Sequence, residues 1–165
     1  MIADRWGVSD ADVARRYPCD DFVQSPVLQA WRGVSINAPA AHVWPWVAQI
    51  RLAPYSYDWI DNLGRRSPQT LQNLPAPHVG EPFTTALGRR FGRIVAVSEG
   101  VSLTGQLAHT MISYVLVEER DRTRLLMKLV AGRGRVTALA LCVGDLVMAR
   151  RQLLNIRRLA ETAAA

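Results

Sequence analysis

Cysteine, lysine and long apolar runs are all scarce in this chain of 165 residues. The two cysteines, Cys19 and Cys142, belong to no Cys-x-x-Cys or Cys/His cluster, which argues against a disulfide framework or a metal site. A Gly-x-Gly-x-x-Gly motif, a Walker sequence and a zinc-ligand spacing are also missing. These motifs carry most nucleotide, flavin and zinc binding that can be read from sequence. We therefore expect no metal and no cofactor.

Basic charge comes almost wholly from arginine. Lys128 is the single lysine among 20 basic residues, and the net charge is +6. The arginines occur in scattered pairs instead of a stripe with interleaved aromatic residues, so we expect solvated surface and no nucleic-acid partner. Richness in arginine and alanine is typical of a bacterial coding sequence with high GC content. The pairs are Arg15-Arg16, Arg65-Arg66, Arg89-Arg90, Arg150-Arg151 and Arg157-Arg158.

No segment has the pattern of a signal peptide or a membrane span. The first six residues lack an apolar signal core. The most apolar stretch, residues 136–148, is too short to cross a bilayer and is interrupted by Gly144 and Asp145. We expect no integral membrane association and a reducing, cytoplasmic location.

The order of the predicted elements indicates an α+β fold. A strand at residues 28–36 leads through Ala38-Pro39 into a helix at residues 39–49. Five strands follow at residues 82–85, 92–98, 102–107, 110–118 and 124–130, with short antiparallel connections. A long helix, residues 136–163, closes the chain. We expect one domain over residues 1–165, with an N-terminal extension (1–27) that holds a short helix at residues 9–17, and a core (28–163).

Residues 51–80 form an insert between the first helix and the sheet. Its first part is dense in aromatic and polar side chains, a composition that suits a small-ligand site. Ser67 is a plausible helix cap before a short helix near residues 71–74. Long inserts with structure of their own are often functional.

The chain resembles the SRPBCC superfamily, which includes START domains, pollen-allergen-type carriers and aromatic polyketide cyclases. The likeness rests on residues 31–44 (WRGVSINAPAAHVW), which match the family's strand, Ala-Pro and Val-Trp helix opening, and on residues 114–117 and 123–125, which match its last two strands. It covers residues 28–160. The resemblance implies a helix-grip fold, in which a curved antiparallel sheet wraps around a long C-terminal helix with a helical insert after strand 1. It carries over no catalytic residue, because the superfamily has no universal catalytic motif.

One face of the last helix is predicted to pack on the sheet. At helical spacing an apolar stripe forms, with Asp145 and Gln152 at its edge. Arg151, Asn155 and Arg158 fall on the opposite side, towards water. The stripe consists of Cys142, Leu146, Ala149, Leu153, Ile156 and Ala160.

Candidate site residues come from the insert and from the last helix. The ligand-binding candidates are Tyr55, Tyr57, Asp58, Trp59, Asp61, Asn62, Asp145, Ala149 and Gln152. Asp58, Asp61 and Asp145 are the catalytic candidates, because a carboxylate with a raised pKa can shuttle protons. The alternative is structural: the aromatic residues fill the cavity, and the carboxylates cap helix turns or pair with arginines. The histidines lack a triad-like spacing and are weak candidates.

Three functions remain open from the sequence. The first is binding of a small hydrophobic or aromatic molecule, lipids included, in an internal cavity. The second is an enzyme of the polyketide cyclase or dehydratase type that uses cavity carboxylates for proton transfer. The third is a structural or regulatory partner protein whose cavity is filled by its own side chains. A cavity with an ionisable group favours the enzyme, an apolar cavity favours the carrier, and a filled core favours the third. The oligomeric state is left open.

Overall fold

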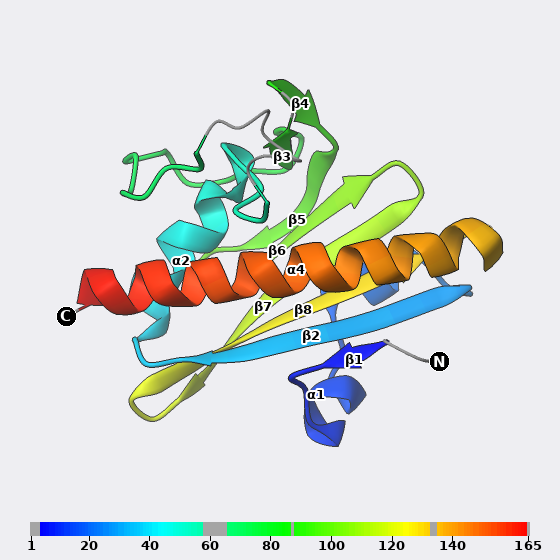
Figure 1. Cartoon of the computed structure of the whole chain (residues 1–165), viewed down its shortest axis with the longest axis horizontal. Coiled ribbons are helices and arrows are strands. Elements are labelled where there is room, and N and C mark those ends of the chain that lie inside the picture. Colours follow the sequence, from blue (N-terminus) through cyan, green and yellow to red (C-terminus); the bar gives the residue numbers. More distant parts are fainter. Residues whose placement is uncertain (1–3, 58–65, 87, 133–134, 165) are drawn as a thin grey trace.

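The computed structural model describes residues 4–57, 66–86, 88–132 and 135–164, with the backbone alone at residue 86 and at residues 135–146. Its main feature is a six-stranded sheet in the order β1-β2-β8-β7-β6-β5 (Figure 1). The strands are β1 (Arg5–Trp6), β2 (Leu28–Ile36), β5 (Arg93–Ser98), β6 (Ser102–Leu107), β7 (Thr110–Glu119) and β8 (Arg122–Ala131). All neighbours are antiparallel except β1, which pairs in parallel with β2. The sheet is therefore mixed, and β1 is a strand that the sequence did not predict.

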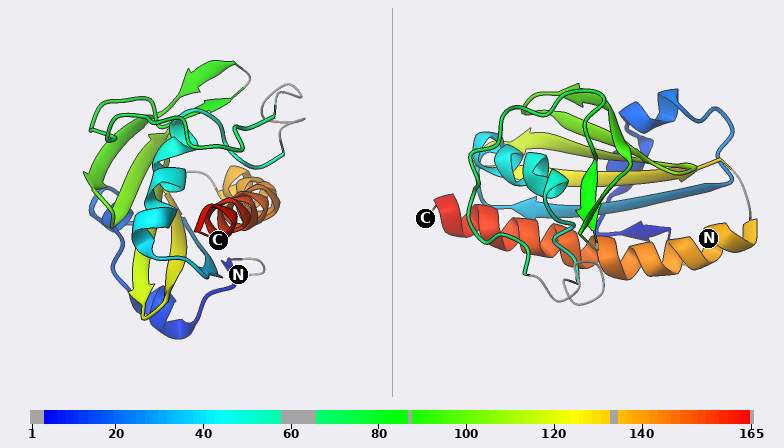
Figure 2. Two further views of the ribbon diagram at one scale, coloured as in Figure 1. Left: turned by 90° about the vertical axis from the view of Figure 1, so that its left-hand side faces the viewer. Right: turned by 90° about the horizontal axis from the view of Figure 1, so that it is seen from above.

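Helices cover one face of this sheet. Helix α2 (Ala40–Ala48) follows β2 and continues into the short 3-10 helix η2 (Gln49–Arg51), and α4 (Arg135–Ala164) runs across the sheet (Figures 1 and 2). A separate hairpin, β3 (Thr84–Ala86) and β4 (Arg89–Phe91), stands above the sheet at one end. Strand β4 lies where the sequence predicted a connection. The α+β helix-grip arrangement with a helical insert after the first long strand is confirmed.

Alternation along the strands sends apolar side chains to both faces of the sheet. On β8, Leu125, Met127 and Leu129 join the core under α4, while Leu126 and Val130 join a second cluster on the opposite face. A strand that reads as continuously apolar is the expected pattern when both faces are buried. We call the face towards α4 the inner face and the opposite face the outer face.

After β1, the rest of the N-terminal segment, residues 7–27, covers the outer face (Figure 2). Its helix α1 (Asp10–Ala14) begins at Ser9, which forms a capping box with Asp12. The predicted helix at residues 9–17 is present but ends earlier, because Arg15 is already extended. The 3-10 helix η1 (Pro18–Asp21) follows, and Tyr17 and Cys19 are fully buried against β7 and β8.

The predicted packing face of the last helix is confirmed where side chains are described. Ala149, Leu153, Ile156 and Ala160 are all buried in the inner core, whereas the side chains of Cys142 and Leu146 lie outside the described residues. Arg151 and Arg158 are exposed as predicted. Asn155 is a correction: it is half-buried, and its Nδ2 donates to the Tyr55 carbonyl at 2.8 Å.

The insert differs from its predicted structure. Residues 66–80 contain no helix, so the short helix expected after Ser67 is absent from the described part of the insert. Ser67 is buried there, and Gln49 holds the segment from η2, donating to the Thr70 carbonyl and accepting from the Gln72 amide. Among the described helices, none is long and apolar enough to cross a membrane.

Candidate functional site

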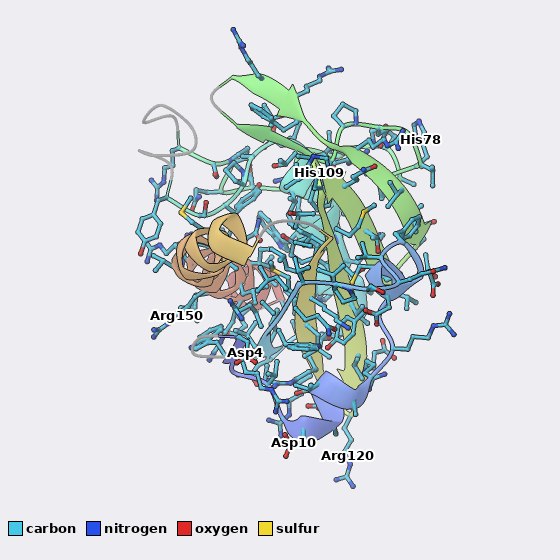
Figure 3. All side chains as sticks on the ribbon, turned by 90° about the vertical axis from the view of Figure 1, so that its right-hand side faces the viewer. Asp4, Asp10, His78, His109, Arg120 and Arg150 are labelled. Atoms are coloured by element: carbon cyan, nitrogen blue, oxygen red, sulfur yellow. The ribbon has the colours of Figure 1, made fainter. Side chains whose placement is uncertain are left out.

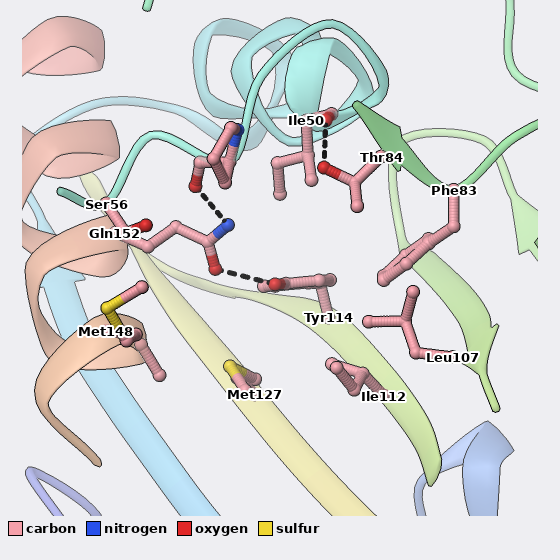
Figure 4. A pocket seen from close by; sticks show the side chains of 12 residues that line it. Ile50, Ser56, Phe83, Thr84, Leu107, Ile112, Tyr114, Met127, Met148 and Gln152 are labelled. Atoms are coloured by element: carbon pink, nitrogen blue, oxygen red, sulfur yellow. Dashed lines mark hydrogen bonds between the residues drawn. The ribbon is translucent and has the colours of Figure 1, made fainter. Parts of the chain in front are cut away.

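A cavity of about 200 Å³ lies between the inner face of the sheet and α4 (Figure 4). Strands β6, β7 and β8 form its floor, α4 forms one wall, and η2, the segment after it and the start of β3 form the others. Most of the lining is apolar. The described lining residues are Ile50, Pro54, Ser56, Phe83, Thr84, Leu107, Ile112, Tyr114, Met127, Met148, Ala149 and Gln152.

Gln152 fixes the polar side of the cavity. Its Oε1 accepts from the Tyr114 hydroxyl at 2.6 Å, and its Nε2 donates to the Pro54 carbonyl at 2.6 Å (Figure 4). Both ends of the amide are thus engaged, and Gln152 is only 7% exposed. A buried amide without partners would be costly. These bonds therefore fix the positions of α4, β7 and the segment after η2 relative to one another.

The segment 53–57 forms a wall that is tied to its neighbours at several points. Tyr55 has a φ of 56°, a left-handed conformation that is uncommon for a residue other than glycine. Its hydroxyl accepts from Gln49 Nε2 at 2.5 Å, and its ring meets Trp46 edge-on at 6.4 Å between centroids. Asn155 binds its carbonyl. The unusual backbone is held in place by these bonds.

Phe83 reaches the cavity because a glycine lies beneath it. A Cβ built on Gly105 of β6 would lie 2.0 Å from the Phe83 ring, so only glycine lets the ring rest on the sheet at this position. The Phe83 ring then packs against Tyr114 with 6.2 Å between centroids. Thr84 follows, and its hydroxyl donates to the Ile50 carbonyl at 3.0 Å. This contact ties the β3 end of the cavity to η2.

The described cavity lining carries no formal charge. It contains no Asp, Glu, His, Lys, Arg or Cys side chain, and Tyr114 is its one titratable group. The ion pair of Arg51 with Glu81, at 2.5 Å, lies outside the lining. Burial opposes ionisation of Glu81, but hydrogen bonds from the His78 amide and from Arg51 outweigh it and lower the pKa. Charged side chains are therefore absent from the described walls of the cavity.

The predicted site residues fall into three groups: those that line the cavity, those that are described but do not line it, and those outside the described residues. Ala149 and Gln152 line the cavity. Tyr55 is buried beside the wall and faces Gln49 and Trp46, and Tyr57 lies under the Arg151 guanidinium at 5.8 Å. Neither tyrosine is among the lining residues. Asp58, Trp59, Asp61 and Asn62 lie outside the described residues, as does the side chain of Asp145.

Sequence reasoning missed most of the lining. Tyr114 and Ile112 on β7 and Met127 on β8 had a usable signal, since strict alternation places them on the same face as the buried Leu116 and Leu125. Phe83 and Met148 had none, because their position depends on the hairpin and on the exact rotation of α4. The three histidines are all exposed, and none lines the cavity.

No family model matches the chain, and no curated protein is similar to it in sequence. Solved structures are similar in fold. Cgl2372, a polyketide cyclase-like protein from Corynebacterium glutamicum, superposes with a TM-score of 0.53 at 14% identity, over 82% of this chain and 92% of that one. The chain has the polyketide cyclase-like fold.

Two further neighbours agree with this fold. Protein MLL2253 from Mesorhizobium loti has a TM-score of 0.55 at 16% identity, over 84% of this chain and all of its own. DynU16, from the dynemicin biosynthetic locus, has a TM-score of 0.50 at 19% identity, with 82% of this chain matching 48% of that protein. The identities are low, so these likenesses establish the polyketide cyclase-like architecture alone.

Within the described parts of the chain, no three His, Cys, Asp or Glu side chains gather closely enough to hold a metal ion. The described site is thus defined by its apolar walls and by a few neutral polar groups, chief among them the hydrogen-bonded pair of Gln152 and Tyr114.

Proposed function

We propose that this protein binds a small, uncharged, apolar or aromatic molecule in the cavity between the sheet and α4. The observation that carries the proposal is the lining itself: apolar and thioether side chains surround a space, with a fixed amide and hydroxyl on one side. Small-molecule sites typically combine apolar walls with a few fixed polar groups. A space of this volume also favours ligand binding over the alternative of a core filled by its own side chains.

The volume limits the size of the ligand. An apolar cavity of about 150 Å³ accommodates benzene, whereas sites for drug-sized ligands occupy roughly 300–1,000 Å³. At about 200 Å³ the described cavity fits a single substituted ring or a short branched chain. Polycyclic molecules would require the walls to move apart.

The neutral lining favours binding over proton transfer. A cyclase or dehydratase mechanism needs a general acid or base within hydrogen-bond reach of the substrate. The described walls offer Tyr114 alone, and its hydroxyl donates to Gln152. An anionic ligand would also meet no cationic partner among these residues. We therefore place simple binding of a neutral molecule ahead of catalysis.

Calorimetric titration with benzyl alcohol and with 1-naphthalenemethanol tests the proposal. We expect benzyl alcohol to bind and the larger naphthalene analogue to bind at least about tenfold more weakly, since overfilling a packed cavity costs roughly 1–3 kcal/mol. Ala149→Phe should fill the space and abolish binding. Val147 lies two residues before Ala149, on the exposed side of the same helix. Val147→Phe is therefore the matched control and should leave binding unchanged.

Binding of benzyl alcohol to Ala149→Phe with wild-type affinity would contradict the proposal, as would an absence of heat with either alcohol. A naphthalene analogue that binds as tightly as benzyl alcohol would overturn the size limit. Circular dichroism of each variant confirms that the fold is retained.

A further inference from the structure

The β3–β4 hairpin presents a basic and aromatic surface. Arg89, Arg90, Phe91 and Arg93 fall within five consecutive positions, and all four side chains are exposed, Phe91 by 42%. The hairpin stands clear of the main sheet at one end of the molecule (Figures 1 and 2). We call these four residues, three on β4 and Arg93 at the start of β5, the hairpin patch.

Among the described residues, no carboxylate forms an ion pair with the arginines of the patch. Residues 82–98 contain no Asp or Glu, and none of Arg89, Arg90 and Arg93 forms an ion pair with a described residue. Arg93 donates instead to the neutral Gln106 at 3.1 Å. Elsewhere on the chain, arginines do pair with carboxylates: Arg5, Arg16, Arg51, Arg124 and Arg157 each do so.

The hairpin is held firmly at its base. Thr84 and Thr85 donate to the carbonyls of Ile50 and Arg51, at 3.0 and 2.8 Å. Gly92, with a φ of 62°, allows the chain to pass against β6, where a Cβ would lie 2.3 Å from the Gln106 carbonyl oxygen. The exposed side chains are thus presented on a fixed support instead of a loose loop.

We propose that the hairpin patch docks the protein on an anionic lipid surface. Three arginines that pair with no described carboxylate are complementary to the negative headgroups of a bilayer. An exposed phenylalanine among them can enter the boundary between headgroups and acyl chains, as aromatic residues do in interfacial anchors. Val79 adds a second apolar side chain, 59% exposed, on the segment that bonds to β5 through Gly80 and Ile94. The exposed apolar groups favour a lipid surface over a nucleic acid, for which phosphate contacts alone would suffice.

Co-sedimentation with phospholipid vesicles tests this docking. Vesicles of phosphatidylcholine with about 30 mol % phosphatidylglycerol should bind the protein, and pure phosphatidylcholine vesicles should not. Because the attraction is between exposed charges, raising the salt from about 0.05 M to about 0.5 M should release the protein. Each neutralised arginine should lower the partition coefficient about fivefold, so R89Q/R90Q/R93Q should lose more than about a hundredfold. Phe91→Ser should lose about tenfold.

The chain offers matched controls at other sites. Phe22 is exposed to a similar extent, 45%, but stands beside Asp20 and Asp21, so Phe22→Ser should bind as the wild type does. Arg120 lies at the opposite end of the molecule from the hairpin (Figure 3), next to three acidic residues, and Arg120→Gln should also have no effect.

Three results would overturn the proposal. The first is a loss of vesicle binding in the control variants equal to that in the patch variants. The second is unchanged vesicle binding of the triple arginine variant. The third is tighter binding to duplex DNA than to anionic vesicles, together with no effect of Phe91→Ser. Benzyl alcohol titration of the hairpin variants keeps the two proposals separate, because ligand binding in the cavity and docking of the hairpin can fail independently.

Discussion

The two faces of the central sheet are both buried, but they are built from different chemistry. The inner face carries Ile112, Tyr114 and Met127 and leaves a cavity beneath α4. The outer face carries Ser113 and Lys128, the alternate residues of the same strands. Ser113 and Lys128 add polar groups to an outer face that also holds the apolar Val115, Leu126 and Val130.

Polar groups on the outer face are paired with the N-terminal segment. Lys128 Nζ lies 2.5 Å from Asp20 and also over the rings of Tyr17 and Trp31. The Cys19 amide donates to Ser113, whose hydroxyl is bonded to Thr104. Burial raises the pKa of the Cys19 thiol to about 11, so this thiol is protonated and unreactive at neutral pH.

This contrast between the inner and outer faces indicates which of them can hold a ligand. A buried polar network is stable only when its members are satisfied, and then it specifies a single arrangement. Lys128, Ser113 and Thr104 on the outer face have that character, with partners that include Asp20 and Cys19 of the N-terminal segment. The inner face is mainly apolar around the cavity, which tolerates an internal space, although the fully buried Arg32 of β2 also lies on this face, opposite Met127.

Removing an inner-face anchor should have the largest effect on stability. Leu153 is fully buried under α4, so Leu153→Ala should lower the free energy of unfolding by about 2–5 kcal/mol. The adjacent Leu154 is 36% exposed, and Leu154→Ala should cost less than about 1 kcal/mol. Denaturant unfolding of both variants measures the difference. Equal losses at the two positions would contradict the assigned face of the helix.

Breaking the outer-face ion pair should cost less. Asp20→Ala leaves the Lys128 ammonium buried without its carboxylate and removes the bond from the Tyr17 amide. We expect a loss of about 2 kcal/mol, below that of a fully buried pair because Asp20 is partly exposed. Adding Lys128→Met should restore part of it, since a buried apolar residue replaces the unpaired charge.

The surface pair Arg16–Asp21 provides the control for this change. Both side chains are largely exposed, so Asp21→Ala should leave the unfolding curve unchanged within error. If the double variant D20A/K128M were less stable than D20A alone, the explanation by an unpaired buried charge would be wrong.

Lowering the pH should weaken the attachment of the N-terminal segment to the sheet. Burial opposes ionisation of Asp12, but hydrogen bonds from Ser9 and Arg124 outweigh it and lower the pKa. A carboxyl with a lowered pKa stabilises the fold above its unfolded pKa of about 3.9 and loses that contribution as the pH falls through the folded value. Asp12→Asn should therefore lower the free energy of unfolding by about 1 kcal/mol at pH 7. Below about pH 4 this variant should lose stability less steeply than the wild type does.

Unfolding midpoints measured from pH 7 to about pH 3 test this sign. Asp10→Asn is the control, because Asp10 is almost fully exposed in its pair with Arg5. A wild-type protein that gains stability on acidification relative to Asp12→Asn would contradict the assignment.

The sequence predicts the framework better than the site, for physical reasons. Alternation on residues 28–36, the strand at residues 124–130 and helical spacing at Leu153 and Ile156 are local patterns, and the structure confirms them. Strand β1 has two residues and pairs only through the tertiary fold. Phe83 reaches the cavity through a contact with the distant Gly105. Ligand binding by the nine candidate residues stays a prediction.

Methyl NMR of the methionines is the most direct test of the central claim, that the inner face binds a small apolar molecule while the outer face is closed. Met127 and Met148 line the cavity, and Met111 belongs to the outer cluster. On titration with benzyl alcohol, the Met127 and Met148 methyl resonances should shift together and saturate, and the Met111 resonance should stay in place. Shifts of Met111 equal to those of Met127, or no saturable shift at Met127 and Met148, would contradict the account.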